Sequence, residues 1–143
     1  MKRKHSHPTV EDFMSTAVLS MKETDTLSAA QIEMQMAEIR HLPVVDSKGH
    51  VVGVLSDRDI LRNLTKIDGK PAPVTQIMSR RVQTVKASLG AAEAAALMIE
   101  RKIGCLPVVG EDEQLVGIIT ETDFLRIAEQ ALRGVDVSRR APE

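Results

Sequence analysis

Aromatic residues are almost absent from this 143-residue chain, which has two Phe, no Tyr and no Trp. Proteins that bind single-stranded nucleic acid or flipped bases usually stack those bases on aromatic rings. The net charge is −1, whereas a protein that grips the phosphate backbone usually carries a basic face. We therefore expect no nucleic-acid partner, and a core built from Val, Ile, Leu, Met and Ala.

Cysteine and long apolar runs are scarce as well. The single cysteine, Cys105, excludes an intramolecular disulfide and a multi-cysteine zinc site, and it suits a reducing cytoplasm. No apolar run approaches the about 20 residues that span a bilayer. The basic start at 1–8 lacks the apolar stretch of a secretion signal, so we expect it to be a flexible tail. These features predict a cytoplasmic protein without a membrane segment.

One unit of sequence occurs twice, at an offset of 64 residues and without a gap, so that 13–62 aligns with 77–126. Sixteen of these fifty pairs are identical. Two blocks carry most of the match: 39–45 with 103–109, and 52–62 with 116–126. Chance does not keep prolines, glycines and acids in register over such a length. We therefore divide the chain into copy 1 (9–65), a proline-containing linker (66–73) and copy 2 (74–133), followed by a C-terminal tail (134–143).

Each copy has the same predicted elements. In copy 1, Thr9 is expected to cap a short helix through Met14, with Asp12 at the third helical position. Asp25 or Thr26 is expected to cap a longer helix to about residue 40, and Ser56 or Asp57 a last helix to about residue 65. Short strands are expected at 17–21, 42–46 and 51–55, with a turn at 47–49.

The longer helix is apolar on two sides. One stripe consists of Leu27, Ala30, Met34 and Ala37, and a second, nearly opposite, of Ile32, Met36 and Ile39. A helix with two apolar sides is covered twice, once by its own sheet and once by another surface. A homodimer is the economical explanation, although packing between the two copies would also supply the second cover.

These residues resemble the CBS domain, and the pair resembles a Bateman module of the stand-alone CBS-pair type. The likeness rests on Leu-Pro-Val-Val and on Gly-x-x-Ser/Thr-x-x-Asp, which occur in both copies at equal spacing. It implies an α+β fold of two βαββα-type repeats packed about a pseudo-twofold axis. It also implies clefts between the repeats that bind AMP, ADP, ATP, S-adenosylmethionine or NAD, and an unidentified partner protein regulated by that binding.

The resemblance places candidate ligand contacts in both copies. Asp59 and Asp123 fall at the ribose-binding position, where a carboxylate accepts from two neighbouring hydroxyls. Ser56 and Thr120 lie at strand-to-helix junctions suited to phosphate, and Arg58 and Thr122 hold a second phosphate-facing position. The adenine is expected against Ile39, Arg40 and His41 in one site and Ile103, Gly104 and Cys105 in the other, with Pro43 and Pro107 holding the following strand.

Other interpretations of the same residues stay open. Ser56 and Thr120 could be helix caps only, although a cap would not by itself call for an acid three residues later in each copy. A metal site at Asp57 and Asp59 is poorly supported, since residues two apart on a helix do not share a face. His41 and Cys105 could form a base and nucleophile, but no third orienting group accompanies them.

The two candidate sites are not equivalent, because Arg58 and Arg40 add charge where copy 2 has Thr122 and Gly104. We therefore expect the Asp59 site to tolerate more phosphate. No Gly-rich phosphate loop, metal cluster or catalytic triad occurs, so we expect no enzyme and no required cofactor. The alternative function is a ligand-independent interaction module that uses the apolar helix faces.

Overall fold

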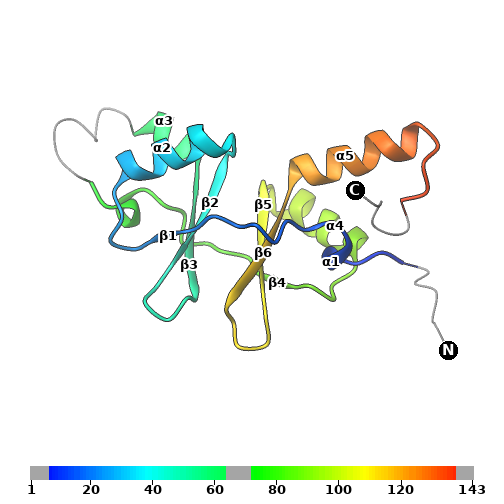
Figure 1. Ribbon diagram of the computed structural model, residues 1–143, viewed down its shortest axis with the longest axis horizontal. Coiled ribbons are helices and arrows are strands. Elements are labelled where there is room, and N and C mark those ends of the chain that lie inside the picture. The colour runs from blue at the N-terminus through cyan, green and yellow to red at the C-terminus, as the bar shows by residue number, and fades with distance from the viewer. Residues whose placement is uncertain (1–6, 64–71, 138–143) are drawn as a thin grey trace. The chain divides into compact units, whose positions relative to one another are not determined.

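The computed structural model describes residues 7–63 and 72–137, which form two compact units of mixed α+β structure. Unit 1 comprises Met1–Val18, Thr84–Asp112 and Val116–Glu143, and unit 2 comprises Leu19–Gln83 and Glu113–Leu115. Each unit contains a three-stranded sheet and helices in the order that the repeat predicts (Figure 1). The βαββα order expected for each copy is therefore confirmed.

Unit 2 is built on the sheet β1-β2-β3. Strand β1 (Met21–Lys22) runs parallel to β2 (His41–Val45), which pairs antiparallel with β3 (Val51–Ser56). Helix α2 (Leu27–Ala37) packs on the sheet, α3 (Asp57–Arg62) follows β3, and a 3-10 turn, η2, covers Val74–Gln76. Its core consists of aliphatic side chains and methionines: Met21, Leu27, Ala30, Met34, Leu42, Val44, Leu55, Ile60, Ala72, Val74 and Met78.

Unit 1 repeats this arrangement with the sheet β4-β5-β6. Its strands are β4 (Val85–Lys86), β5 (Cys105–Val109) and β6 (Leu115–Thr120). Its helices are α1 (Val10–Phe13), α4 (Ala91–Arg101) and α5 (Glu121–Leu132). Helix α5 has 12 residues, whereas its counterpart α3 has 6. No residue of α5 is buried.

The opening segments of the two copies, 9–18 and 74–83, are exchanged between the units. Segment 9–18 of copy 1 lies in unit 1, and segment 74–83 of copy 2 lies in unit 2. In unit 1, the N–H of Val10 donates to the carbonyl of Leu89 at 2.8 Å, and the N–H of Ala91 donates to the carbonyl of Pro8 at 2.9 Å. The equivalent bonds in unit 2 join Val74 to Asp25 and Leu27 to Ala72, both at 2.9 Å. Each unit therefore contains residues of both sequence copies, and the copy boundaries describe the repeat rather than the compact units.

The sequence-based caps are largely confirmed. Thr9 and Asp12 form a capping box at α1, and Thr26, not Asp25, caps α2 by accepting from the N–H of Ala29 at 3.2 Å. The predicted strand over 17–21 is wrong, because pairing with Val44 and Val45 places β1 at Met21–Lys22. Helix α2 ends at Ala37 rather than near residue 40, since Glu38 adopts the left-handed conformation with φ 56°.

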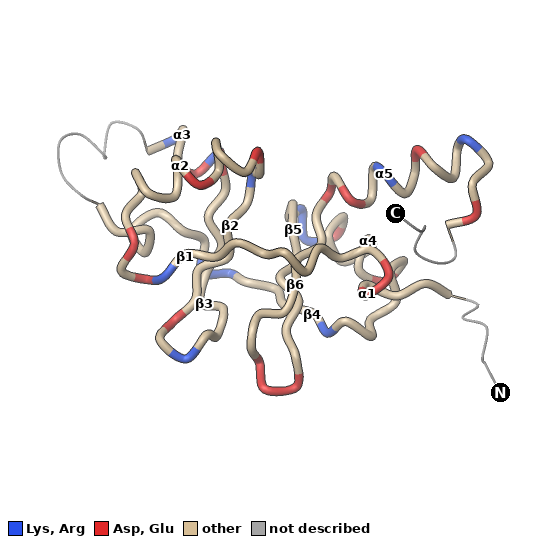
Figure 2. Tube along the Cα trace, viewed as in Figure 1, with Lys and Arg blue, Asp and Glu red and all other residues tan. Residues whose placement is uncertain are grey.

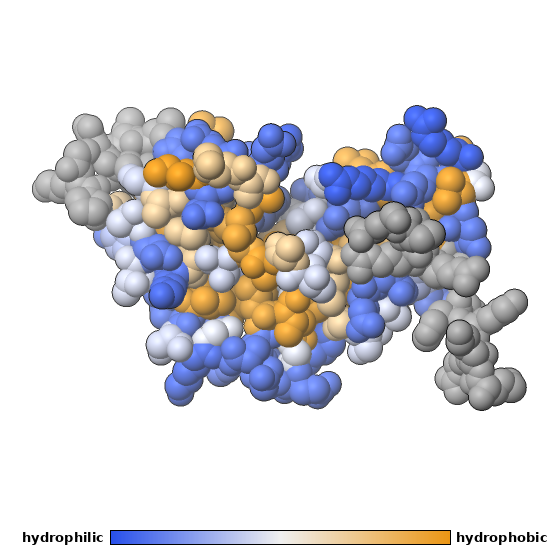
Figure 3. Space-filling model, viewed as in Figure 1, coloured by the Kyte–Doolittle hydropathy of each residue, from blue (hydrophilic) through white to orange (hydrophobic). Residues whose placement is uncertain are grey.

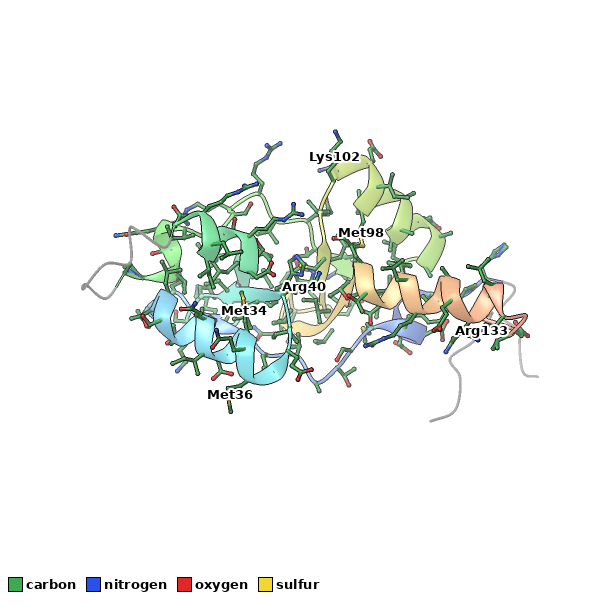
Figure 4. The ribbon with its side chains drawn as sticks, turned by 90° about the horizontal axis from the view of Figure 1, so that it is seen from above. Met34, Met36, Arg40, Met98, Lys102 and Arg133 are labelled. Carbon is green, nitrogen blue, oxygen red and sulfur yellow. The ribbon has the colours of Figure 1, made fainter. Side chains whose placement is uncertain are left out.

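The two sides of α2 differ in burial. Met34 faces the core, whereas Met36 is 81% exposed and points away from the sheet (Figure 4). Ile32 on the same outer side is 58% exposed, while Ala37, expected in the inner stripe, is exposed as well. The prediction of an inner apolar stripe thus holds for Leu27, Ala30 and Met34. Of the predicted outer stripe, Ile32 and Met36 are exposed, whereas Ile39 packs, partly buried, against the core of its own unit.

Several sequence-based expectations fall outside the described residues: most of the basic tail, the end of the helix after Ser56, most of the linker, and residues 138–143. Within 7–63 and 72–137, no helix is long and apolar enough to cross a membrane.

Candidate functional site

The strongest candidate site in unit 2 lies where β3 passes into α3. Ser56 is the N-cap of α3: its Oγ accepts from the N–H of Asp59 at 3.1 Å, and its own N–H donates to Asp59 Oδ2 at 2.9 Å. Both side chains are half-buried, whereas Arg58 between them is exposed. The junction thus fixes a hydroxyl and a carboxylate side by side, next to an exposed guanidinium.

Unit 1 has the same arrangement where β6 passes into α5. The N–H of Thr120 donates to Asp123 Oδ2 at 2.8 Å, and Thr120 Oγ1 accepts from the N–H of Asp123 at 3.4 Å. Here the hydroxyl of Thr120 also donates to Asp123 Oδ2 at 3.1 Å. No such acceptor occupies the Ser56 hydroxyl within the described part of unit 2, so that O–H is available to a ligand.

These capping boxes correct one step of the sequence argument. The acid three residues after Ser56 or Thr120 is the reciprocal partner of the cap, so a cap does account for it. The same pattern occurs at Thr9 and Asp12. The cap uses Oδ2 of each carboxylate, and among the described residues the Oδ1 atoms of Asp59 and Asp123 have no hydrogen-bond partner. A cap and a ligand contact are therefore compatible at both acids.

The residues expected to contact adenine lie directly beside these junctions. In unit 2, His41 is paired with Ser56, and the carbonyl of Arg40 accepts from the N–H of Asp57 at 2.9 Å. In unit 1, the carbonyl of Gly104 accepts from the N–H of Glu121 at 3.0 Å. Ile39 and Ile103 are partly buried against the cores of their units. Each unit thus brings its predicted apolar and polar contacts together.

Cys105 is a buried thiol at the start of β5. Burial, together with the negative charge of Glu121, raises its pKa to about 12. A nucleophilic cysteine needs the thiolate form, so this environment does not suit catalysis. His41, its counterpart in the repeat, belongs to the other compact unit.

Pro43 and Pro107 are fully buried in the middle strands β2 and β5. Proline has no N–H for a sheet and is usually excluded from central strands. Strand β1 pairs with β2 only at Val44 and Val45, so Pro43 lies where that side of β2 has no neighbour. Both prolines are thus buried in the strands that begin beside the candidate sites, and their expected role of holding the strand stays a prediction.

Two segments that begin at Ser15 and Ser79 lie beside the candidate sites without having been predicted there. Ser15 exchanges two backbone hydrogen bonds with Ile118 of β6, at 2.9 and 3.0 Å, and Ser79 exchanges two with Val54 of β3 at the same distances. Each segment thus runs along the strand that ends in a candidate site of its unit. The Met-Ser pair that recurs at the offset of 64 residues, Met14-Ser15 and Met78-Ser79, was the available signal, because both methionines are buried.

A second concave feature occurs in unit 1. An apolar groove of about 200 Å³ lies among α1, α4, α5 and the C-terminal segment, and both phenylalanines of the chain, Phe13 and Phe124, line it. The groove has no charged lining residue, so it offers nothing to orient a polar ligand. Among the described residues, no three His, Cys, Asp or Glu side chains are placed to hold a metal ion.

Comparison with known proteins gives two matches to one family. Residues 10–66 and 74–129 each match the CBS domain. A CBS domain-containing protein of Dictyostelium discoideum is 30% identical over 138 residues, covering 88% of this chain and 94% of its own length. Inosine-5′-monophosphate dehydrogenase of Methanocaldococcus jannaschii is 32% identical over 109 residues, which cover 76% of this chain. The match covers only 21% of the length of that enzyme. Homoserine O-acetyltransferase of Methanohalobium evestigatum is 30% identical and is matched over 25% of its length. The chain thus spans about a quarter of the length of these enzymes.

Solved structures agree with these matches. A candidate acetoin utilization protein (AcuB) from Vibrio cholerae is 37% identical with a TM-score of 0.79, covering 89% of this chain and 94% of that one. The CBS domain pair of protein MJ0100, solved with 5′-methylthioadenosine and S-adenosyl-L-methionine, is 27% identical with a TM-score of 0.80, covering 87% and 98%. CBSX2, solved with AMP, is 32% identical with a TM-score of 0.75, covering 88% and 99%.

Proposed function

The chain belongs to the CBS domain family, and from that membership we propose that it is a regulatory module that binds an adenine nucleotide or another adenosyl ligand. The observation that carries the proposal is the paired hydroxyl and carboxylate at the same junction of each unit, Ser56 with Asp59 and Thr120 with Asp123. Solved relatives bind AMP, 5′-methylthioadenosine and S-adenosyl-L-methionine, which supports the adenosyl class.

In this proposal each side chain has a distinct role. The Oδ1 atoms of Asp59 and Asp123, which the caps leave without a partner, accept hydrogen bonds from the ribose hydroxyls. The backbone beside them and the half-buried Ile39 and Ile103 cover the adenine, and a buried Cys105 adds apolar surface. The Ser56 hydroxyl and Arg58 meet phosphate oxygens in unit 2. ADP, ATP and NAD remain candidate ligands beside AMP and S-adenosylmethionine.

Binding is proposed to act on a partner protein rather than on a reaction. The high pKa of Cys105 leaves a neutral thiol, so we propose no enzymatic role for it. A ligand can shift an equilibrium between packed states only by the difference in its affinity for them. The partner would read that shift, and a reducing compartment such as the cytoplasm is the proposed setting for the single thiol.

A second candidate function is a ligand-independent interaction module. The exposed hydrophobic side chains favour it: Ile32, Met36, Leu61, Ile99, Leu125 and Leu132. Hydrophobic side chains interrupt the hydrophilic surface along α2 and along α5 (Figure 3). The simplest occupant of such faces is a second copy of this chain, so a homodimer remains our prediction.

A thermal-shift screen distinguishes the two functions. The ligands are AMP, ADP, ATP, S-adenosylmethionine and NAD, with GTP as a non-adenine control, tested on wild type freed of carried-over nucleotide. A ligand at 100 times its dissociation constant stabilises the fold by about 2.7 kcal/mol, a shift of several degrees. The Asp59→Asn/Asp123→Asn variant keeps an oxygen for each cap but loses the charge, so it should stay folded and lose the shift. If no adenosyl ligand stabilises the wild type, the interaction module becomes the better proposal.

A further inference from the structure

Four arginines of unit 2 stand at positions whose counterparts in unit 1 are uncharged. At the offset of 64 residues the pairs are Arg40 with Gly104, Arg58 with Thr122, Arg80 with Thr16 and Arg81 with Ala17. In sequence, the first two arginines belong to copy 1 and the last two to copy 2. Because the opening segments are exchanged, all four arginines lie in unit 2, and all four uncharged counterparts lie in unit 1.

Backbone contacts attach the arginine positions to the elements of the candidate site. Arg40 is bonded through its carbonyl to the N–H of Asp57, so Arg40 and Arg58 flank the start of α3. Arg80 and Arg81 follow Ser79, which is paired in both directions with Val54. This pairing is antiparallel, so Arg80 and Arg81 continue toward the start of β3, away from Ser56. Arg40 and Arg58 are therefore the cationic residues at the junction itself, and Arg80 and Arg81 add positive charge to the same unit.

These guanidinium groups are available to an anion. All four side chains are exposed, and within the described part of the chain none of them forms an ion pair. Among contacts between described residues, Arg80 is the only one of the four whose side chain donates a hydrogen bond, from Nη2 to the carbonyl of Thr75 at 3.4 Å. The acids at the two junctions match in number, Asp57 and Asp59 in unit 2 against Glu121 and Asp123 in unit 1, so they do not cancel the difference.

Charge at the ends of α2 and α4 runs the other way, because Ala37 and Glu38 of unit 2 correspond to Arg101 and Lys102 of unit 1. Figure 4 shows Lys102 at the tip of α4, directed away from its own helix. Over all described residues unit 2 is still the less acidic unit, with seven Lys and Arg against eight Asp and Glu, where unit 1 has five against ten. Figure 2 shows acidic residues at the start of α5, and the first basic residue within this helix is Arg126. The hydroxyl groups also favour phosphate binding in unit 2. The Thr120 hydroxyl donates to Asp123, whereas the Ser56 hydroxyl is available to a ligand.

We propose that the two sites select ligands by charge: the unit 2 site takes an adenosine ligand with two or three phosphates, and the unit 1 site takes one with little negative charge at its 5′ position. This inference rests on the proposed function, because it assumes that both junctions bind adenosine. Guanidinium groups donate paired, charge-assisted hydrogen bonds to phosphate oxygens, and Gly, Ala and Thr supply no such charge.

Calorimetry with ATP and with uncharged 5′-methylthioadenosine tests the inference in two backgrounds. Asp123→Asn leaves the unit 2 site intact, and Asp59→Asn leaves the unit 1 site intact. In the first background, ATP should bind at least about tenfold more tightly than methylthioadenosine, and in the second the order should reverse. In the first background, the affinity for ATP should also fall more steeply with increasing salt concentration than the affinity for methylthioadenosine, because the phosphate contacts are ionic.

Removing the charge difference should remove the selectivity. Arg40→Gly/Arg58→Thr gives unit 2 the residues of unit 1, and these exposed positions should tolerate the change without unfolding. The variant should lose most of the preference for ATP, whereas Arg62→Thr, whose counterpart Arg126 is also basic, should retain it. Equal ATP-to-methylthioadenosine ratios in the two backgrounds, with both ligands bound, would overturn this inference alone. Absence of binding by either ligand would overturn the proposed function together with it.

Discussion

Asp59 and Ser56 hold each other by two reciprocal hydrogen bonds, from the N–H of Ser56 to Asp59 Oδ2 at 2.9 Å and from the N–H of Asp59 to Ser56 Oγ at 3.1 Å. The carboxylate proposed to bind ribose is therefore placed by the start of a helix before any ligand arrives. A side chain held in this way loses less conformational entropy on binding than a mobile one. Stability and binding are thus linked at the same atoms.

Substituting the carboxylate should separate these two effects. Asp59→Ala removes the reciprocal acceptor and should lower the free energy of unfolding by about 1 kcal/mol. Asp59→Asn keeps an oxygen that accepts from Ser56, so it should lose less stability while losing ligand affinity. Urea unfolding measures the first effect and calorimetry the second. Asp12→Ala, which breaks the equivalent box at α1 outside the candidate sites, should lower stability and leave affinity unchanged; weakened binding in that variant would contradict the assignment.

The exchanged opening segment should control the stability of unit 1. Met14 is buried in the core of that unit, against Gly117 of β6. Met14→Ala should therefore cost about 2–5 kcal/mol. Hydrogen exchange should quicken in β5 and β6, which belong to copy 2, and not in β2 and β3, which belong to the same copy as Met14. Gln35→Ala, at an exposed polar position of α2, serves as the control and should leave exchange unchanged.

Cys105 should make stability fall at alkaline pH. Its pKa is about 12 in the folded chain, against an ordinary value of 9.0, so the unfolded chain releases the thiol proton first. The contribution is complete below pH 9 and is lost as pH rises toward 12, with a slope of at most about 1.4 kcal/mol per pH unit. Urea unfolding from pH 8 to 10.5 should therefore show a steeper decline for wild type than for Cys105→Ala. Parallel declines would contradict the assignment.

The outer apolar side chains should support a homodimer. Sedimentation equilibrium of wild type should give twice the chain mass of 15.7 kDa. Charges placed at the exposed apolar positions, Met36→Glu with Ile99→Glu, should shift the population to monomer without loss of thermal stability within the monomer. Gln35→Glu, an exposed polar neighbour on α2, should not. A wild type that is monomeric at every concentration would remove the homodimer from the proposal.

Much of the fold could be predicted because its signals are local. The repeat at an offset of 64 residues, the turn at 47–49 and the caps at Thr9 and Ser56 depend on residues that are close in sequence, and the structure confirms them. The positions of β1 and of the end of α2 depend instead on pairing with Val44 and Val45 and on the left-handed backbone of Glu38. Hydrophobic pattern does not report either feature.

The exchange of opening segments lay beyond sequence reasoning for a physical reason. Met14 and Met78 are the same residue at equivalent positions, so each suits the core of either unit. Only tertiary contacts decide which core receives which methionine. For the same reason the sequence does not predict that four arginines share one unit. Arg80 and Arg81 are far in sequence from Arg40 and Arg58, and they belong to the same unit only because of the exchange.

The exchange of opening segments also determines the order in which the cores of the two units can form during synthesis on the ribosome. Unit 2 draws nearly all its residues from one continuous stretch, Leu19–Gln83, so its core is complete once that stretch has emerged. Val10 and Met14 precede unit 2 in the chain but have no core to join until β6 has been made. During synthesis their side chains therefore stay exposed longer than the hydrophobic residues of unit 2.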